Sequence, residues 1–196
     1  MGDVAALGRA AGFLLNQVKV NRALYLGVDG ALDRAVTAWA KTLVGDDPSD
    51  EATWQRALAV TRGGTPKDLD KFVQTERSRL RLRALETLHE ESGKAIEMIG
   101  DRLAVLIFDK GKLTEDDLAG TKLIVFGKSE SAVAERTGSR WFVSPGHIGT
   151  PQGGVAVLTE EKDEITFTLY DSSGHKIREE LLVQHRETKM RVQGDA

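Results

Sequence analysis

The chain has 196 residues, enough for one domain with a buried core, and we expect a single domain over 1–196. Its formal net charge of −3 gives no indication that it binds nucleic acid or an anionic membrane. The absence of cysteine excludes disulfides, thiolate catalysis and cysteine-based zinc sites, and it fits a cytoplasmic protein. No basic segment followed by a long apolar run opens the chain, so no signal peptide is predicted.

The first half of the chain predicts mainly helices. Apolar residues recur at helical spacing in four stretches, and Thr65-Pro66 is a typical start for the last of them. A short apolar run that ends at Gly27 predicts one buried strand among these helices. The predicted helices span 3–17, 29–43, 51–60 and 67–91, and the strand spans 20–26.

The second half predicts mainly strands. Two apolar runs flank Gly100-Asp101-Arg102 and form a predicted hairpin of 96–99 with 103–108. The nearly continuous apolar character of 103–108 and 122–126 predicts neighbouring strands buried on both faces. Further strands are expected at 140–144, 154–159, 164–170 and 177–183, with a polar, frayed tail at 185–196.

Three of these strands end in short polar signatures. Asp109 follows the first, Gly127-Lys128-Ser129-Glu130 follows the second, and Ser144 to Gly149, with His147, follows the third. Loops at the strand ends of an α/β sheet are common ligand sites, so these residues are candidates for a site.

The order of these strand-end signatures resembles that of calcineurin-like metallophosphoesterases. The resemblance implies an α/β fold of the αββα sandwich type, with two packed sheets flanked by helices, a helix-rich N-terminal half and a strand-rich C-terminal half. In that family two divalent metals, held by carboxylates and imidazoles at the strand ends, activate water and clamp a phosphate.

The sequence departs from the family at the metal ligands. Ala5 follows Asp3-Val4 where the family has histidine, and Asp29 is displaced by one position. Asp109 and Lys128-Ser129-Glu130 replace three histidines, whereas the Pro145-Gly146 turn is kept. The resemblance therefore implies a degenerate member with no catalytic residue and no metal ligand assigned. Its vestigial cleft would comprise Asp3, Asp29, Asp109, Lys128, Ser129, Glu130 and His147.

Two features of this sequence have two interpretations each. The ammonium of Lys128 either takes the place of a metal by neutralising Asp29 or Asp109, or lies in solvent on a loop. The loop Arg62-Gly63-Gly64 either presents backbone N–H groups to an anion or is an ordinary connection between helices.

Three functions stay open on the sequence. The first is a non-catalytic binding or scaffold module without a cofactor, whose partner is an unknown protein or a small anionic ligand. The second is a phosphoesterase with Mg²⁺ or Mn²⁺ held by Asp3, Asp29, Asp109 and Glu130. The third is a function of an unrelated α+β domain, with a ligand site that the sequence does not identify. The oligomeric state is not predicted.

Overall fold

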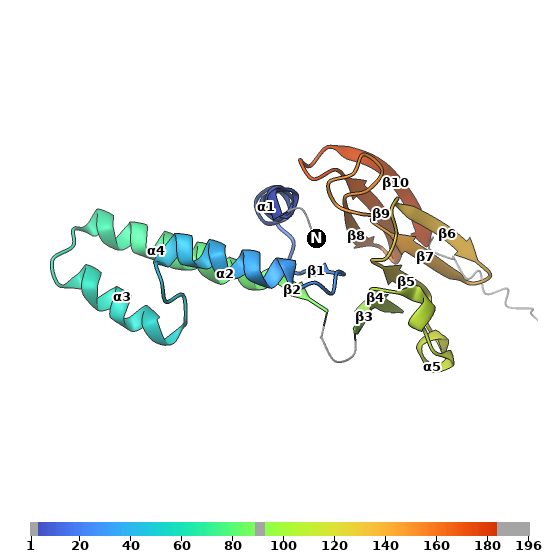
Figure 1. Cartoon of the computed structure of the whole chain (residues 1–196), viewed down its shortest axis with the longest axis horizontal. Helices are drawn as coiled ribbons and strands as arrows, with labels where there is room; N and C mark the ends of the chain where they lie inside the picture. Colours follow the sequence, from blue (N-terminus) through green and yellow to red (C-terminus); the bar gives the residue numbers. More distant parts are fainter. Residues whose placement is uncertain (1–3, 89–92, 184–196) are drawn as a thin grey trace, which may run out of the picture.

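The computed structural model describes residues 4–88 and 93–183. It is a mixed α/β structure with its long helices in the first half and most of its strands in the second, as predicted (Figure 1). The predicted tail and Asp3 lie outside the described residues. None of the helices in the described part has the length and apolar character of a membrane-spanning segment.

The helices of the first half form two groups. Helix α1 (Val4–Phe13), extended by a π-helical turn η1 (Leu14–Val18), packs beside a sheet, where the Phe13 and Tyr170 ring centroids are 4.8 Å apart. Helices α2 (Ala31–Val44), α3 (Glu51–Thr61) and α4 (Pro66–Arg81) form an arm that projects away from the sheets (Figure 1). Leu32 of α2 packs against Leu85 in a second buried cluster, whereas α3 and α4 extend further from the sheets (Figure 1).

Helix α4 begins where it was predicted to begin and ends earlier than predicted. Thr65 and Asp68 form a reciprocal capping box at its start. The predicted helix over 67–91 is wrong at its end, because α4 stops at Arg81 and continues only as the 3₁₀ turn η2 (Leu82–Ala84). The next residues form strand β2 (Leu85–Thr87), which pairs in parallel with β1 (Ala23–Tyr25). Burial of Leu85 in this pairing outweighs the local helical pattern.

The remaining strands form two sheets. One has five strands in the order β3-β4-β5-β7-β6, and the other has three in the order β10-β9-β8. The strands of the first are β3 (Lys94–Ile99), β4 (Arg102–Ile107), β5 (Leu123–Phe126), β6 (Val133–Thr137) and β7 (Arg140–Ser144). Those of the second are β8 (Val155–Glu161), β9 (Glu164–Tyr170) and β10 (Lys176–Val183). The turn η3 (Lys110–Lys112) and helix α5 (Glu115–Leu118) connect β4 to β5.

The central strands are those that the apolar pattern predicted. Strands β4 and β5 are parallel neighbours, with Val105 opposite Ile124 and Ile107 opposite Phe126, and all four residues are buried. The predicted hairpin of β3 with β4 is also confirmed. Strand β6 was missed, since its exposed Glu135 and Arg136 interrupt any apolar alternation.

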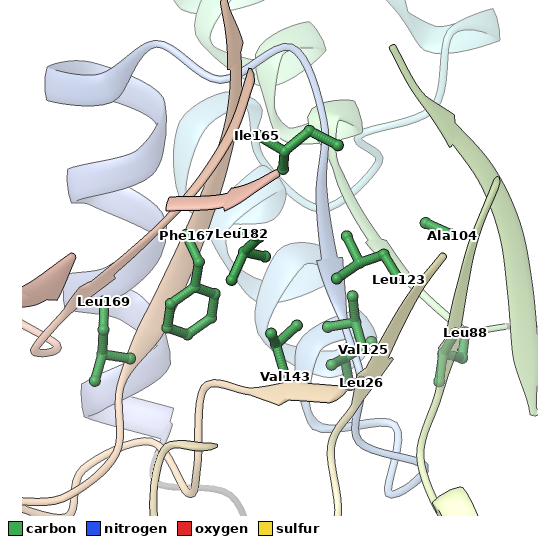
Figure 2. Close-up of a cluster of buried hydrophobic side chains, with 10 residues drawn as sticks. All are labelled: Leu26, Leu88, Ala104, Leu123, Val125, Val143, Ile165, Phe167, Leu169 and Leu182. Carbon is green, nitrogen blue, oxygen red and sulfur yellow. The ribbon is translucent and has the colours of Figure 1, made fainter. Parts of the chain in front are cut away.

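The main core lies between the two sheets (Figure 2). Ile165, Phe167 and Leu169 of β9 face Val143 of β7 and Val125 of β5 across this core. Leu26, just after β1, belongs to the same cluster. The ends of β1, β5 and β7 therefore meet at one place in the molecule, and the loops that follow them meet there too.

Candidate functional site

A cavity of about 570 Å³ lies where these strand ends meet. Its wall is formed by α1, by β1 and the loop after it, and by inner-face residues of both sheets. Most lining side chains are apolar; examples are Leu7 and Leu14 of α1, Leu106 and Val143 of the larger sheet, and Phe167 of β9. The cavity can therefore exclude water from a bound apolar group.

Glycines let the strand ends approach one another at the cavity. A Cβ atom on Gly127, directly after β5, would lie 2.7 Å from the Cβ of Leu26 and 2.9 Å from its carbonyl oxygen. A Cβ atom on Gly27 would lie 2.4 Å from the ring of Tyr25. Because such distances are too short for a side chain, the lack of Cβ at Gly127 lets the loop after β1 lie against the end of β5, and the lack of Cβ at Gly27 leaves room for the Tyr25 ring.

Tyr25 and Asp29 form a polar pair in the cavity wall. The Tyr25 hydroxyl donates to Asp29 Oδ1 at 3.1 Å, and the same oxygen accepts from the Ala31 amide at 3.1 Å. Burial, together with the nearby Asp29 charge, raises the pKa of Tyr25 to about 12. Tyr25 is thus an uncharged hydrogen-bond donor at neutral pH, and Asp29 also anchors the start of α2.

Among the described residues that line the cavity, Arg22 is the one arginine, and there is no lysine. Its guanidinium bonds Glu86 of β2, with Nε–Oε2 at 2.9 Å and Nη2–Oε2 at 2.8 Å, and it also pairs with Glu97 of β3. The hydrogen bonds that Arg22 donates to these carboxylates raise its pKa further above its already high value. The ion pairs tie the β1–β2 pair to the edge of the five-stranded sheet.

The strand-end residues after β4 and β5 form a separate polar group. Lys128 Nζ donates to Asp109 Oδ2 at 2.7 Å, and the Gly111 amide donates to Asp109 Oδ1 at 2.9 Å. These two donors lower the pKa of Asp109. The Lys128 side chain is 62% exposed, so its ammonium bonds Asp109 at the surface of the molecule.

The residues of the predicted cleft do not all line the cavity. Asp29 and His147 line the cavity, whereas Asp109, Lys128, Ser129 and Glu130 do not. Ser129 Oγ donates to the Ser131 carbonyl at 2.6 Å, and the Glu130 carbonyl accepts from the His147 amide at 3.3 Å. Within 4–88 and 93–183, no three histidine, aspartate or glutamate side chains form a group able to hold a metal ion.

The predicted anion loop lies far from the cavity, between α3 and α4 at the outer end of the arm (Figure 1). The amides of Arg62 and Gly64 donate to the Leu58 and Val60 carbonyls at 3.2 and 2.8 Å. Asp68 accepts from the Thr65 amide and hydroxyl at the start of α4. These backbone donors therefore have partners within the chain. An anion site at Arg62-Gly63-Gly64 stays a prediction, and this loop is not part of the cavity.

Sequence reasoning missed Arg22, Tyr25 and Glu97 as site residues. The partners of Arg22 come from the pairing of β1 with β2 and from the position of this pair beside β3, whereas Tyr25 bonds Asp29, four residues further along the chain. Arg22 and Glu97 are 75 positions apart along the chain. No local spacing pattern joins residues at such a distance, so only the tertiary structure identifies them.

Comparison with known proteins gives structural matches alone. No family model and no curated protein sequence matches this chain. Among solved structures, zinc-bound Vps29 from Entamoeba histolytica matches with 17% identity and a TM-score of 0.38, over 55% of this chain and 76% of that one. A predicted phosphoesterase from Streptococcus pneumoniae matches with 10% identity and a TM-score of 0.38, over 52% and 72% of the two chains.

A third match spans more of this chain. The hypothetical protein PH1004 from Pyrococcus horikoshii covers 95% of this chain and 85% of its own, with 13% identity and a TM-score of 0.37. The matched structures include the class of protein that the strand-end motifs resemble. Likeness at these TM-scores identifies no shared function, so the function of this chain rests on its own residues.

Proposed function

We propose that the chain is a non-catalytic binding module whose cavity takes a small, uncharged and largely apolar ligand. The observation that carries this proposal is the cavity of about 570 Å³, whose lining is mostly apolar. Its size lies within the roughly 300–1,000 Å³ that is typical of sites for small molecules. The Tyr25 hydroxyl, whose proton is donated to Asp29, can accept a hydrogen bond from one polar group of the ligand and so orient it.

The charges of the lining favour an uncharged ligand over the small anion that the sequence left open. The described lining residues include one guanidinium, on Arg22, and two carboxylates, on Asp29 and Glu97. The guanidinium is already bonded to Glu97 and to Glu86. An anionic ligand would meet a net negative wall and would have to break these ion pairs, which disfavours its binding.

The chemistry of the strand-end side chains supports binding without hydrolysis. A phosphoesterase with Mg²⁺ or Mn²⁺ would need the carboxylates of Asp29, Asp109 and Glu130 to converge with that of Asp3. Asp109 instead accepts from Lys128 and from the Gly111 amide. An ammonium bonded to a candidate ligand carboxylate repels a divalent cation, so we propose that the module works without a resident metal.

The proposal is tested with two fluorescent dyes and with two variants in which an alanine is replaced by phenylalanine. We expect the uncharged dye Nile red to bind the parent more tightly than the anionic dye anilinonaphthalene sulfonate. Ala156→Phe, in β8, should fill part of the cavity and weaken Nile red binding at least about tenfold, which corresponds to about 1.4 kcal/mol. Ala134→Phe, in β6, is the matched control, because Ala134 is also half-buried beside the core but does not line the cavity.

Three outcomes would contradict the proposal. They are no binding of Nile red by the parent, equal binding by Ala156→Phe and the parent, and tighter binding of the anionic dye. Calorimetry with Mn²⁺ tests the alternative separately: stoichiometric binding that Asp109→Asn abolishes would favour the phosphoesterase.

A further inference from the structure

Helix α3 has one side that contacts no other part of the described structure closely. It lies at the outer end of the arm and packs along α4 (Figure 1). Its inner side carries the buried Ala52 and Arg56, whose Nε bonds Glu76 of α4 at 2.7 Å. Its opposite side leaves Trp54 77% exposed and Leu58 53% exposed. Tryptophan so exposed is unusual on a free surface and is enriched at the centres of protein interfaces.

These two side chains belong to a single stripe along the helix. Glu51, Trp54, Leu58 and Arg62 follow one another at spacings of three, four and four, which places them on one side of an α-helix. Arg62 keeps helical backbone angles, with φ −70° and ψ −12°, so the stripe continues to this residue. We name these four residues the outer stripe.

The ends of the outer stripe carry opposite charges. Glu51 is exposed at the first residue of α3 and Arg62 is exposed just after its last. Within residues 4–88 and 93–183, neither side chain forms an ion pair; the charged partners of α3 and its neighbours are Arg56, Glu76, Arg79 and Asp50. Two unpaired opposite charges at the two ends of an apolar stripe give it a direction.

The spacing of the stripe makes it complementary to itself. Glu51 and Arg62 are centred between positions 56 and 57, and Trp54 and Leu58 are centred on position 56. When two copies of α3 lie antiparallel, Glu51 of each copy therefore faces Arg62 of the other. The same arrangement places Trp54 of each copy over Leu58 of the other. A parallel arrangement would instead oppose like charges, which disfavours it.

We propose that the outer stripe is the contact surface of a homodimer, in which two copies of α3 pack antiparallel across a two-fold axis. Such a contact is isologous, because the same residues serve on both copies. One helix face per copy falls below the roughly 800 Å² per partner of a standard interface, so the dimer is weak and forms with rising concentration. The proposal is independent of the cavity and of its ligand.

Sedimentation velocity over a range of protein concentrations tests the contact. The parent should shift from monomer to dimer as its concentration rises, and Leu58→Ala should move this transition at least about tenfold higher in concentration. Leu69→Ala on α4 is the matched control, because Leu69 is a 39% exposed leucine of the same arm outside the stripe. A parent that stays monomeric throughout, or a Leu58→Ala variant that dimerises like the parent, overturns the proposal.

Charge exchange tests the antiparallel register. Glu51→Arg and Arg62→Glu should each abolish the homodimer, because each variant places like charges opposite one another at both ends. Mixing the two variants should restore a dimer, since both ends of the mixed pair then join Arg with Glu. Arg77→Glu, an exposed site on α4, should dimerise like the parent. If the mixed variants stay monomeric while circular dichroism shows both to be folded, the proposal fails.

Discussion

The polar side chains at the strand ends of this protein form hydrogen bonds within the chain. In the family that its motifs resemble, the corresponding positions hold metal ligands. Lys128 bonds Asp109 at the surface, with Nζ–Oδ2 at 2.7 Å, and Ser129 bonds the backbone of its own loop. Asp29 bonds Tyr25 and the amide of Ala31 at the start of α2. These contacts stabilise loops around an apolar cavity, and they use carboxylates that a metal would otherwise need.

The Tyr25–Asp29 pair predicts a specific loss of stability in alkali. Because the folded state keeps the Tyr25 proton up to about pH 12, and the unfolded state releases it near 10, stability falls as the pH rises through this window. In Tyr25→Phe this dependence should be absent. An ultraviolet titration of tyrosinate checks it, because the sequence has two tyrosines and the high component should vanish in the variant. A component near 12 that persists in Tyr25→Phe would contradict the assignment.

Lys128→Ala should change the pKa of Asp109 but have little effect on the stability of the fold. The Lys128 ammonium lowers the pKa of Asp109, so its removal should raise that pKa toward the ordinary value, while the Gly111 amide still lowers it in part. Because Lys128 is mostly exposed, the unfolding temperature at neutral pH should stay near that of the parent. Carboxyl NMR titration and thermal melts check both statements. A large drop in unfolding temperature would show that Lys128 separates crowded carboxylates.

The secondary-structure elements differ in the interactions that stabilise them. Strands β4 and β5 are buried on both faces, whereas the arm of α2, α3 and α4 is held together partly by ion pairs. Arg79 of α4 is buried and bonds Glu76 at 2.7 Å and Asp50 at 2.9 Å. The sheets thus depend on apolar burial, and the arm depends strongly on one polar cluster.

The arm should be sensitive to the loss of Glu76. Burial acts to raise the pKa of Glu76, but hydrogen bonds from Arg56 and Arg79 outweigh it and lower the pKa. Glu76→Gln removes the carboxylate partner of Arg56 and leaves Arg79 with Asp50 alone, at an expected cost of about 2–4 kcal/mol in the stability of the arm. Hydrogen exchange of the α3 and α4 amides measures this cost. Asp70→Asn, an exposed site on α4, is the control and should leave their exchange unchanged.

The central strand β5 should not tolerate a charge. The Ile124 side chain is fully buried, so Ile124→Asp would place an unpaired carboxylate in the core and is expected to unfold the domain. The conservative change Ile124→Val should cost only about 1 kcal/mol. Ile96→Asp makes the same substitution at a 57% exposed position of edge strand β3 and should stay folded. Circular dichroism distinguishes these outcomes, and a folded Ile124→Asp would contradict the central place of β5.

The molecule as a whole combines a two-sheet body, with a cavity at its strand ends, and a helical arm that carries an exposed stripe (Figure 1). The two features lie in different parts of the structure, since no residue of α3 or α4 lines the cavity. Ligand binding and self-association are therefore separable by mutation, and each proposal stands without the other.

The whole protein is expected to lack metal-dependent phosphatase activity. The strand-end positions that would need imidazole ligands carry Asp109, Lys128 and Glu130 instead, and His147 is the one histidine among the described residues that line the cavity. An assay of p-nitrophenyl phosphate hydrolysis with Mn²⁺ should show no turnover above that of a heat-denatured sample. Turnover that Asp109→Ala abolishes would establish the carboxylate-based phosphoesterase in place of the binding module.

The sequence by itself determined the helical first half, the order of the principal strands and the burial of β4 and β5. Long apolar runs and capping residues such as Thr65 encode these elements locally, which is why they are readable without a structure. The tertiary structure alone decided that residues 85–87 form a strand, that Arg22 forms an ion pair with Glu97, and that Asp109 is the carboxylate that Lys128 bonds. Each of these depends on contacts between distant parts of the chain, where the free energy of pairing exceeds the local preference.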